Sequence, residues 1–358
     1  MKKALIVTVY NSENCGSFLQ AFALKQVLTN IGFEVAFYKR DTKETSHQFS
    51  SRILPAIKSI FKFQLKKAFF LIGSWFKYES AQKIFKICDF QSDFMNKADI
   101  IIIGSDTLWN FDSPYFKKRF DIYSGKIFKN KKIITYAISA ANTSPETFHQ
   151  VLLECNNNIK NISSILVRDK YTQELIKQYS SDTIKIVCDP TLLLTPIDYK
   201  ILSNRKHITK PFLLLYYFNS FTQPQQESII QYAKEKKLEI ISLLTYRKWC
   251  NKSIMPSPQN MIFYFSHATC VITDTFHGTA FSLIYEKRFA VFDEGKNKVK
   301  ELLLIYDKQD HLFKHYEDLP LILNKTNDVV LSGKYDEIRN QSIYNLVQSI
   351  KSIKNGNN

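Results

Sequence analysis

The chain has 358 residues, of which 45% are apolar, and its 49 lysines and arginines outnumber its 33 aspartates and glutamates. This length and apolar content exclude a disordered or fibrous protein and allow two domains, each with its own core. The six cysteines are scattered without a CxxC pair, which argues against a structural zinc site and a disulfide framework. We therefore expect a protein of the reducing cytoplasm. The apolar run after Met1 is short and is soon followed by polar residues, so it fits a first strand better than a secretory signal.

The excess of 16 positive charges fits nucleic acid, an anionic membrane surface, anionic small substrates or simply a lysine-rich solvated surface. The lysines are spread along the whole chain, and no RNP, zinc-finger or helix-turn-helix pattern occurs. A nucleic-acid partner is therefore not expected. The other three explanations stay open, and the sequence does not indicate an oligomeric state.

Strand-like and helix-like segments alternate from the first residues onward, which predicts parallel strands joined by helical crossovers. The first series contains, in chain order, Ala4–Tyr10 (strand), Ser17–Asn30 (helix), Glu34–Lys39, Asp99–Ile103 and Lys132–Ile138 (strands), Pro145–Lys160 (helix), Ile165–Arg168 (strand) and Tyr171–Ser180 (helix).

The alternation restarts after Pro196. The second series contains Phe212–Phe218 (strand), Gln223–Lys237 (helix), Glu239–Leu244, Cys270–Thr273 and Phe289–Phe292 (strands) and a terminal helix, Lys334–Lys354. We therefore predict an α/β protein of two Rossmann-like doubly wound domains facing a cleft, residues 1–195 and residues 196–358, with the terminal helix in the second domain.

Residues 53–90 interrupt this pattern, because aromatic and aliphatic residues are interspersed there with lysines. We expect a basic, aromatic helical insertion in the first domain. An amphipathic helix that lies on an anionic membrane is one interpretation, and it would place the protein at the inner face of the membrane. Inserted helices that pack their aromatic side on the domain are the interpretation that we favour.

Glycine is scarce, so three glycines at the ends of apolar runs are informative. Gly16 follows the first strand, Gly104 follows the four isoleucines that end at Ile103, and Gly278 stands beside His277 in a polar turn. Backbone at such positions can approach a ligand closely. The Rossmann pattern GxGxxG is absent, which makes an NAD enzyme unlikely.

Six segments together resemble the polysaccharide pyruvyl transferase family and follow that family's order. They are Asn14–Leu24, Gly104–Asn110, Tyr136–Ser139, Val167–Asp169, Asp189–Leu194 and Thr273–Thr279. The resemblance implies a glycosyltransferase-B-like pair of α/β domains. It also implies a transferase that moves an enolpyruvyl unit from phosphoenolpyruvate onto sugar hydroxyls to form a pyruvate ketal, in surface or exopolysaccharide synthesis. The partners would be phosphoenolpyruvate, as co-substrate, and a glycan or lipid-linked sugar.

Ketal formation requires an acid, a base and cations, and the family motifs offer candidates for each. His277 is the expected proton carrier because imidazole titrates near neutral pH. Asp189 is the first choice for a base or orienting partner, before Asp274 and Asp106, although all three aspartates could instead cap helices. Arg168 is the candidate clamp for the donor's phosphate or carboxylate, since its guanidinium is a planar fork of constant charge. A salt bridge is the structural alternative for Arg168.

Thr275 departs from the family pattern, in which many members have an arginine two residues before the active-site histidine. We expect donor binding to be shared among Thr275, Thr279, the backbone near Gly278, and Lys298.

The expected acceptor-binding residues come from the two loops of the first domain. They are Asn14, Gly16, Ser17, Gln20, Ser105, Asp106 and Trp109. A tight loop held by a buried Trp109 is an equally good interpretation of the second loop. No metal site or DxD motif is indicated, and no cofactor is expected. The rival functions are a nucleotide-sugar-dependent glycosyltransferase and an inactive glycan-binding relative.

Overall fold

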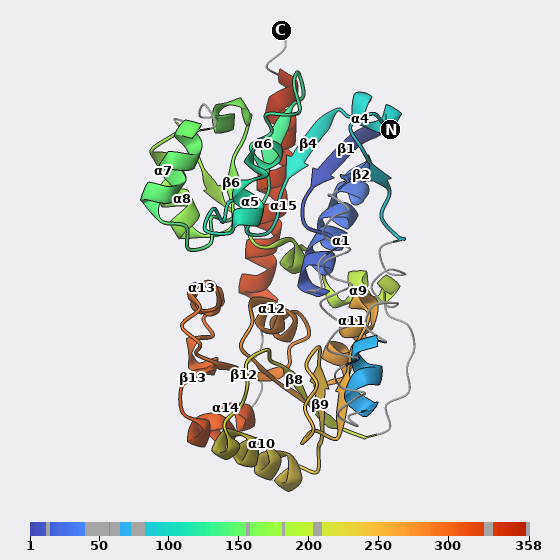
Figure 1. Cartoon of the computed structure of the whole chain (residues 1–358), viewed down its shortest axis with the longest axis vertical. Coiled ribbons are helices and arrows are strands. Elements are labelled where there is room, and N and C mark those ends of the chain that lie inside the picture. The colour runs from blue at the N-terminus through green and yellow to red at the C-terminus, as the bar shows by residue number, and fades with distance from the viewer. Residues whose placement is uncertain are drawn as a thin grey trace. The chain divides into compact units, whose positions relative to one another are not determined.

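The computed structural model describes residues 1–11, 15–39, 57, 65–72, 83–154, 158–180, 183–202, 210–325 and 332–355. The chain divides into two compact units (Figure 1). The first unit consists of Met1–Arg40, Lys83–Leu194 and Asp336–Asn358, and the second consists of Asp41–Gln82 and Thr195–Tyr335.

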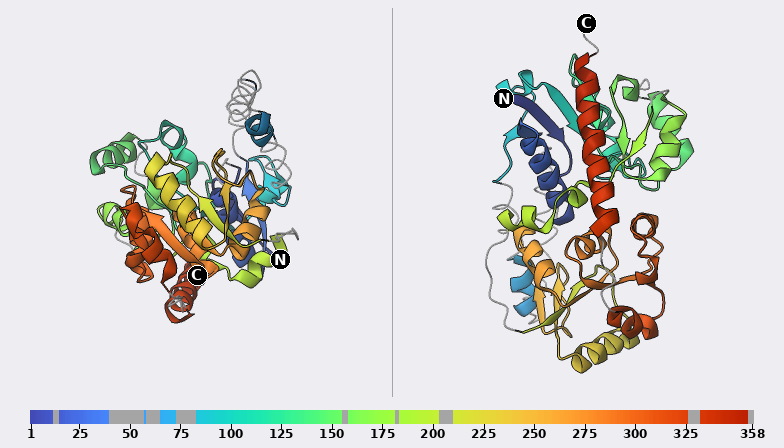
Figure 2. Two further views of the ribbon diagram at one scale, coloured as in Figure 1. Left: turned by 90° about the horizontal axis from the view of Figure 1, so that it is seen from below. Right: turned by 180° about the vertical axis from the view of Figure 1, so that it is seen from behind.

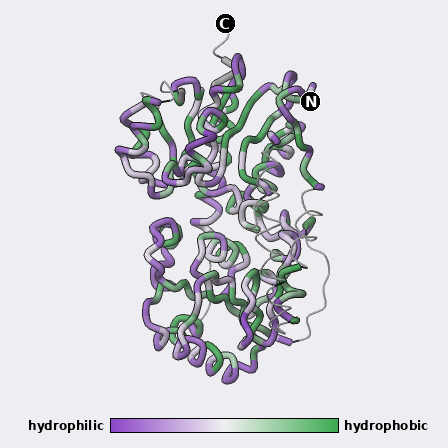
Figure 3. Tube along the Cα trace, in the orientation of Figure 1, coloured by the Kyte–Doolittle hydropathy of each residue, from purple (hydrophilic) through white to green (hydrophobic). Residues whose placement is uncertain are grey.

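The first unit is built on a five-stranded parallel sheet with the strand order β3-β2-β1-β4-β5, beside a two-stranded pair, β6-β7. Apolar residues dominate these strands (Figure 3), and all four isoleucines of β4 are buried, as expected for a parallel sheet covered on both faces. The strands are β1 (Lys2–Val7), β2 (Phe33–Tyr38), β3 (Ile87–Cys88), β4 (Ile100–Ile103), β5 (Ile133–Thr135), β6 (Leu166–Val167) and β7 (Lys185–Ile186).

The longest helix that follows a strand of this unit, α1 (Cys15–Asn30), is buried along most of its length. The other helices of the unit are α4 (Asp93–Asn96), α5 (Pro114–Lys117), α6 (Phe120–Tyr123), α7 (Pro145–Glu154), α8 (Lys170–Lys177) and the 3₁₀ turn η2 (Pro190–Leu193).

The second unit has a six-stranded parallel sheet with the order β10-β9-β8-β11-β12-β13. Its strands are β8 (Phe212–Tyr216), β9 (Glu239–Leu243), β10 (Lys252–Ile254), β11 (Cys270–Thr273), β12 (Arg288–Phe292) and β13 (Leu312–Phe313). Its helices include α9 (Pro196–Tyr199), α10 (Gln223–Glu235), α11 (Pro258–His267), α12 (Phe276–Ile284), α13 (Asn297–Ile305) and α14 (Leu319–Asn324).

Both sheets are doubly wound, because the first strand of each series lies inside the sheet and later strands are added on both sides. The strand order therefore reverses between β1 and β4 in the first unit and between β8 and β11 in the second. Ligands of open α/β sheets bind outside the carboxyl ends of the strands at such a reversal. The fold thus selects the loops after these four strands as the places to search for a site.

The terminal helix corrects the predicted domain division. Helix α15 (Ser332–Asn355) begins in the second unit, but from Asp336 onward it belongs to the first (Figure 2). Ser342 Oγ accepts a hydrogen bond from the Cys188 N–H at 3.0 Å, and the hydroxyls of Ser349 and Ser164 are 2.8 Å apart. These contacts join the helix to β-strand ends and loops of the first unit.

The predicted insertion is also shorter than expected, since Ile87–Cys88 forms strand β3 of the first sheet. Residues 65–72 are helical and are grouped with the second unit, not with the first as predicted. Ala68 is buried and the Phe70 ring lies 5.9 Å from that of Tyr246, whereas Leu65 and Phe69 are exposed. The rest of 53–82, except residue 57, lies outside the described residues, so membrane contact stays a prediction. None of the described helices is both long and apolar enough to cross a bilayer.

Candidate functional site

In the first unit, the loop after β4 brings Asp106 to the strand reversal. Gly104 makes this possible: its φ is +123°, and a Cβ there would lie 2.2 Å from the Tyr136 carbonyl oxygen. Asp106 Oδ1 accepts the Thr107 N–H at 2.8 Å, and Oδ2 accepts the Ser17 hydroxyl at 3.2 Å. Asp106 and Ser17, both predicted acceptor residues, thus come together from β4 and α1, and Asp106 is only half-buried.

Three other predicted acceptor residues are buried deeper. Gln20 is fully buried, and its amide donates to Thr8 Oγ1 at 3.0 Å and to the Val9 carbonyl at 2.9 Å. Ser105, also fully buried, donates its hydroxyl to Gln20 Oε1. These bonds join the loop after β1 to the loop after β4, so both side chains hold the loops that carry Asp106. Gly16 is buried in the first turn of α1.

Trp109 has no exposed ring face. Its side chain is fully buried, its indole N–H donates to the Tyr123 carbonyl at 3.1 Å, and its ring packs edge-on against Phe148. This arrangement agrees with the packing interpretation that the sequence left open, and a sugar cannot stack on the ring without displacing the core. Asn14, the remaining predicted acceptor residue, lies outside the described residues.

Arg168 and Asp189 form a buried ion pair in the first unit. Arg168 Nη1 lies 3.2 Å from Asp189 Oδ2, and Asp189 Oδ1 accepts both the N–H and the hydroxyl of Thr191, at 3.0 and 2.8 Å. Both carboxylate oxygens of Asp189 are therefore engaged within the first unit. Asp189 caps the turn η2 and neutralises Arg168, which is the salt-bridge alternative to a donor clamp.

The charges around Arg168 also disfavour an anionic donor there. Burial disfavours the charged guanidinium, but the carboxylates of Asp189, Asp106 and Asp169 outweigh burial and raise the pKa of Arg168 above its usual value. A phosphate placed beside Arg168 would be repelled by the same carboxylates. These contacts favour Arg168 as the counter-charge of the carboxylates, and its role as a donor clamp stays a prediction.

In the second unit, the residues predicted to bind the donor form the hydrogen bonds of the turn from β11 into α12. Thr275 is the N-cap of α12, and its hydroxyl accepts the Gly278 N–H at 2.9 Å. The Thr279 hydroxyl, in turn, donates to the Thr275 carbonyl at 2.9 Å. Gly278 is required for close approach, since a Cβ there would lie 2.0 Å from Thr273 Oγ1. A phosphate would have to compete with the hydrogen bonds that hold this turn.

His277 is the second residue of α12 and is held at the strand reversal by the turn before it. The side chain is 9% exposed, and its ring lies edge-on to the Phe276 ring, with centroids 5.4 Å apart. A nearly buried imidazole in the first helical turn after a central strand is well placed to carry a proton to a bound ligand.

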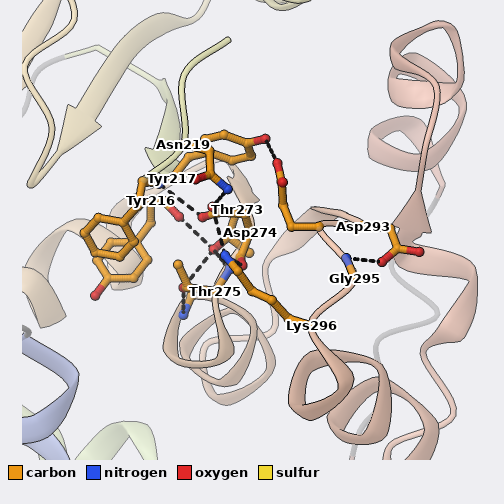
Figure 4. A network of polar contacts seen from close by, with 12 residues as sticks. Tyr216, Tyr217, Asn219, Thr273, Asp274, Thr275, Asp293, Gly295 and Lys296 are labelled. Carbon is orange, nitrogen blue, oxygen red and sulfur yellow. Dashed lines mark hydrogen bonds and ion pairs between the residues drawn. The ribbon is translucent and has the colours of Figure 1, made fainter. Parts of the chain in front are cut away.

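Asp274, next to the turn, is the centre of a polar network at the carboxyl ends of the strands. Its Oδ1 accepts the Phe218 N–H at 3.1 Å. Its Oδ2 accepts the amide of Asn219 at 3.1 Å and the ammonium of Lys296 at 3.2 Å. Figure 4 shows the side chains of Asn219 and Lys296 both directed at Asp274. Phe218 and Asn219 follow β8 and Lys296 follows β12, so three strands contribute to this network.

The sequence prediction missed two cations at these strand ends, Lys296 and Arg247. Lys298 was predicted, but it is exposed on α13, whereas Lys296, two residues earlier, contacts Asp274. Arg247, which follows β9, was also missed although it is only 7% exposed. The available signal was position, because Asn219, Arg247 and Lys296 each stand three or four residues after the end of a buried strand. Among the described residues, no three His, Cys, Asp or Glu side chains gather as a metal site.

Solved structures similar to this chain define the class of fold. A Listeria monocytogenes protein described as a UDP-N-acetylglucosamine 2-epimerase matches with a TM-score of 0.59 and 9% identity, over 100% of this chain and 98% of that chain. The UDP-GlcNAc 2-epimerase of Methanocaldococcus jannaschii matches with a TM-score of 0.58 and 10% identity, over 98% and 100%. The fold is therefore that of the glycosyltransferase-B-like enzymes, with two parallel α/β sheets.

The family follows from the sequence itself. The family model for polysaccharide pyruvyl transferase matches residues 14–296, which include β4 of the first unit, β8 and β11 of the second unit, and the loops after these strands. The chain belongs to the polysaccharide pyruvyl transferase family. A search of the curated proteins gave no match.

Proposed function

We propose that this protein transfers the enolpyruvyl unit of phosphoenolpyruvate to two hydroxyls of a glycan or lipid-linked sugar, forming a pyruvate ketal for a surface polysaccharide or exopolysaccharide. The observation that carries the proposal is the family match over residues 14–296, because it includes His277 and the loops after β4, β8 and β11. No metal or other cofactor enters the proposal.

The reaction needs a mobile proton, and His277 is the residue proposed to carry it. Protonation of the enol methylene makes the methyl group and leaves a cationic carbon, which the two sugar hydroxyls attack while the bond to phosphate breaks. Two C–O bonds form and one breaks. One hydroxyl proton balances the proton given to carbon, and the other leaves with phosphate. A histidine that donates the first proton and recovers it from a hydroxyl completes this cycle.

The acceptor sugar is proposed to meet Asp106 and Ser17. Asp106 is half-buried and carries a carboxylate that accepts hydrogen bonds, which suits hydroxyl groups rather than anions. Arg168 would act on the sugar only indirectly, through its effect on the neighbouring carboxylates. Asp189, which Arg168 holds in place, would likewise act on the sugar only indirectly.

The test is to incubate the purified protein with phosphoenolpyruvate and pooled acceptor glycans, and to follow phosphate release and the new ketal methyl signal by NMR. We expect His277→Ala to lower the rate about 10²- to 10⁴-fold, as for loss of a general acid. His315→Ala removes an exposed histidine of the same unit and should retain the wild-type rate.

Two results would contradict the proposal in different ways. An unchanged rate in His277→Ala would mean that His277 is not the proton carrier. The donor assignment fails if no acceptor supports consumption of phosphoenolpyruvate while a nucleotide sugar is consumed. That second result would favour a nucleotide-sugar-dependent transferase. A protein of similar fold, the Neisseria meningitidis UDP-GlcNAc 2-epimerase, with a TM-score of 0.52, is bound to the nucleotide sugar UDP-GlcNAc.

A further inference from the structure

Arg247 is a buried arginine whose guanidinium is fixed by the main chain. It follows β9 and is 7% exposed. A single terminal nitrogen, Nη2, donates to the carbonyls of Tyr217 and Asn219, at 2.8 and 2.7 Å. The guanidinium carbon also lies 4.5 Å from the centre of the Phe221 ring. The loop after β9 is thereby tied to the loop after β8, and the cation is held in one orientation.

The charge of Arg247 lacks the partner that a buried arginine usually has. Within the described part of the chain, no carboxylate lies within ion-pair distance of it, and its Nε N–H is buried without an acceptor. Burial lowers the pKa of Arg247, and Asp274, a carboxylate that opposes this effect, is already paired with Lys296. A buried charge without a counter-ion is costly, so its presence here calls for an anion that the described residues do not supply.

The position of Arg247 is that of a ligand-binding residue. Asn219, whose carbonyl accepts from Arg247, gives its side-chain amide to Asp274, and Asp274 immediately precedes Thr275. Arg247 is therefore one residue removed from the network at the reversal between β8 and β11, where ligands of doubly wound sheets bind. The other candidate groups there are less suited: the Lys296 ammonium is engaged by Asp274, and the uncharged Thr275 caps α12.

We propose that Arg247 binds the anionic group of the co-substrate in the second unit, and so supplies the positive charge that Thr275 does not. The ligand chemistry is a phosphate or carboxylate, since a guanidinium fits both. Naming phosphoenolpyruvate as the source of that anion rests on the proposed function, whereas the anion site itself does not.

Calorimetric titration tests this site with two probes, inorganic phosphate and phosphoenolpyruvate. We expect the wild type to bind both, and Arg247→Met, whose side chain still covers the aromatic rings, to weaken binding of both at least about tenfold, the loss of one charge-assisted contact. Arg288→Met is the matched control, because Arg288 begins β12 at the opposite end of the same sheet. It should bind as the wild type does.

The outcomes separate the two proposals. Wild-type affinity in Arg247→Met overturns the anion site, even if phosphoenolpyruvate is consumed. Phosphate binding that depends on Arg247, without any use of phosphoenolpyruvate, keeps the anion site and overturns the donor assignment. If Arg247→Met does not fold, hydrogen exchange of the wild type decides: phosphate should slow exchange in peptides covering 217–221 and 244–250. Slowing only elsewhere, or none, overturns the proposal.

Discussion

The two units place a buried acid and a cation at their strand ends, but they use them differently. In the first unit, Arg168 and Asp189 are 9% and 1% exposed and neutralise each other. In the second unit, Asp274 is equally buried, but its partner Lys296 has a side chain that is 35% exposed. Among the described residues, the Arg247 guanidinium contacts main-chain carbonyls and aromatic rings but no carboxylate. The first unit thus has a closed ion pair, whereas the second unit has the cation that we propose for ligand binding, Arg247.

Removing the acid from each pair should give the largest difference between the units. Asp189→Asn leaves Arg168 charged and buried, and we expect it to lower the free energy of unfolding by about 3–5 kcal/mol. Asp274→Asn should cost only about 1–2 kcal/mol, because Lys296 can turn to solvent and the amide oxygen still accepts hydrogen bonds.

Urea unfolding measures this difference if each unit is followed by its own tryptophan. Trp109 belongs to the first unit and Trp249 to the second, so variants with Trp75 and one of these two replaced by Phe report on one unit at a time. Equal losses of unfolding free energy in the two units would show that the Arg168–Asp189 pair depends on its acid no more than the Lys296–Asp274 pair does.

A smaller effect should come from Gly278→Ala, which tests how tightly the turn of the second unit is packed. The new Cβ would lie 2.0 Å from Thr273 Oγ1, and this hydroxyl is fixed by its hydrogen bond to the Tyr216 carbonyl at 2.7 Å. We expect a loss of about 1–3 kcal/mol, as for other overpacked sites. The readout is urea unfolding of the second unit.

Gly333→Ala is the control for that substitution. Gly333 lies in the first turn of α15 and has no atom within 4 Å of a built Cβ. Alanine there should be neutral or should stabilise the protein by up to about 1 kcal/mol, because it favours the helix. A neutral Gly278→Ala would mean that the turn can open, and that the hydroxyls of Thr273 and Thr275 are available to a ligand after all.

The sequence was sufficient to predict the elements whose signal is local. The isoleucines of β4, the strand β11 and the polar turn at His277 follow from apolar runs and the polar residues after them. The two-domain α/β fold followed from the repeated alternation of such segments.

Partners far apart in the chain could not be predicted in this way. Asp189 stands 21 residues from Arg168, and Ser342 stands 154 residues from Cys188. Periodicity assigns a residue to a face of its own element but does not say what packs there, so α15 was assigned to the wrong unit. Likewise, nothing in the segment 296–300 distinguishes Lys296, which contacts Asp274, from Lys298, which is exposed.

The smallest of these effects should come from the helix caps, one neutral and one charged. Thr275 caps α12 through the Gly278 N–H, and Asp169 caps α8 through the Thr172 N–H at 2.7 Å. Alanine at either position should cost about 1 kcal/mol. The conservative variants should differ, because Asp169 also contributes a negative charge that stabilises the Arg168 guanidinium, whereas Thr275 carries no charge.

We therefore expect Thr275→Ser to leave the free energy of unfolding within about 0.5 kcal/mol of the wild type, and Asp169→Asn to cost more although it keeps a capping oxygen. Raising the salt concentration should narrow the Asp169→Asn difference and leave Thr275→Ser unchanged, since only the former depends on charge. If both conservative variants match the wild type at low salt, the carboxylates around Arg168 do not act as one group. The contrast between the buried ion pair of the first unit and the partly exposed pair of the second would then rest on Asp189 alone.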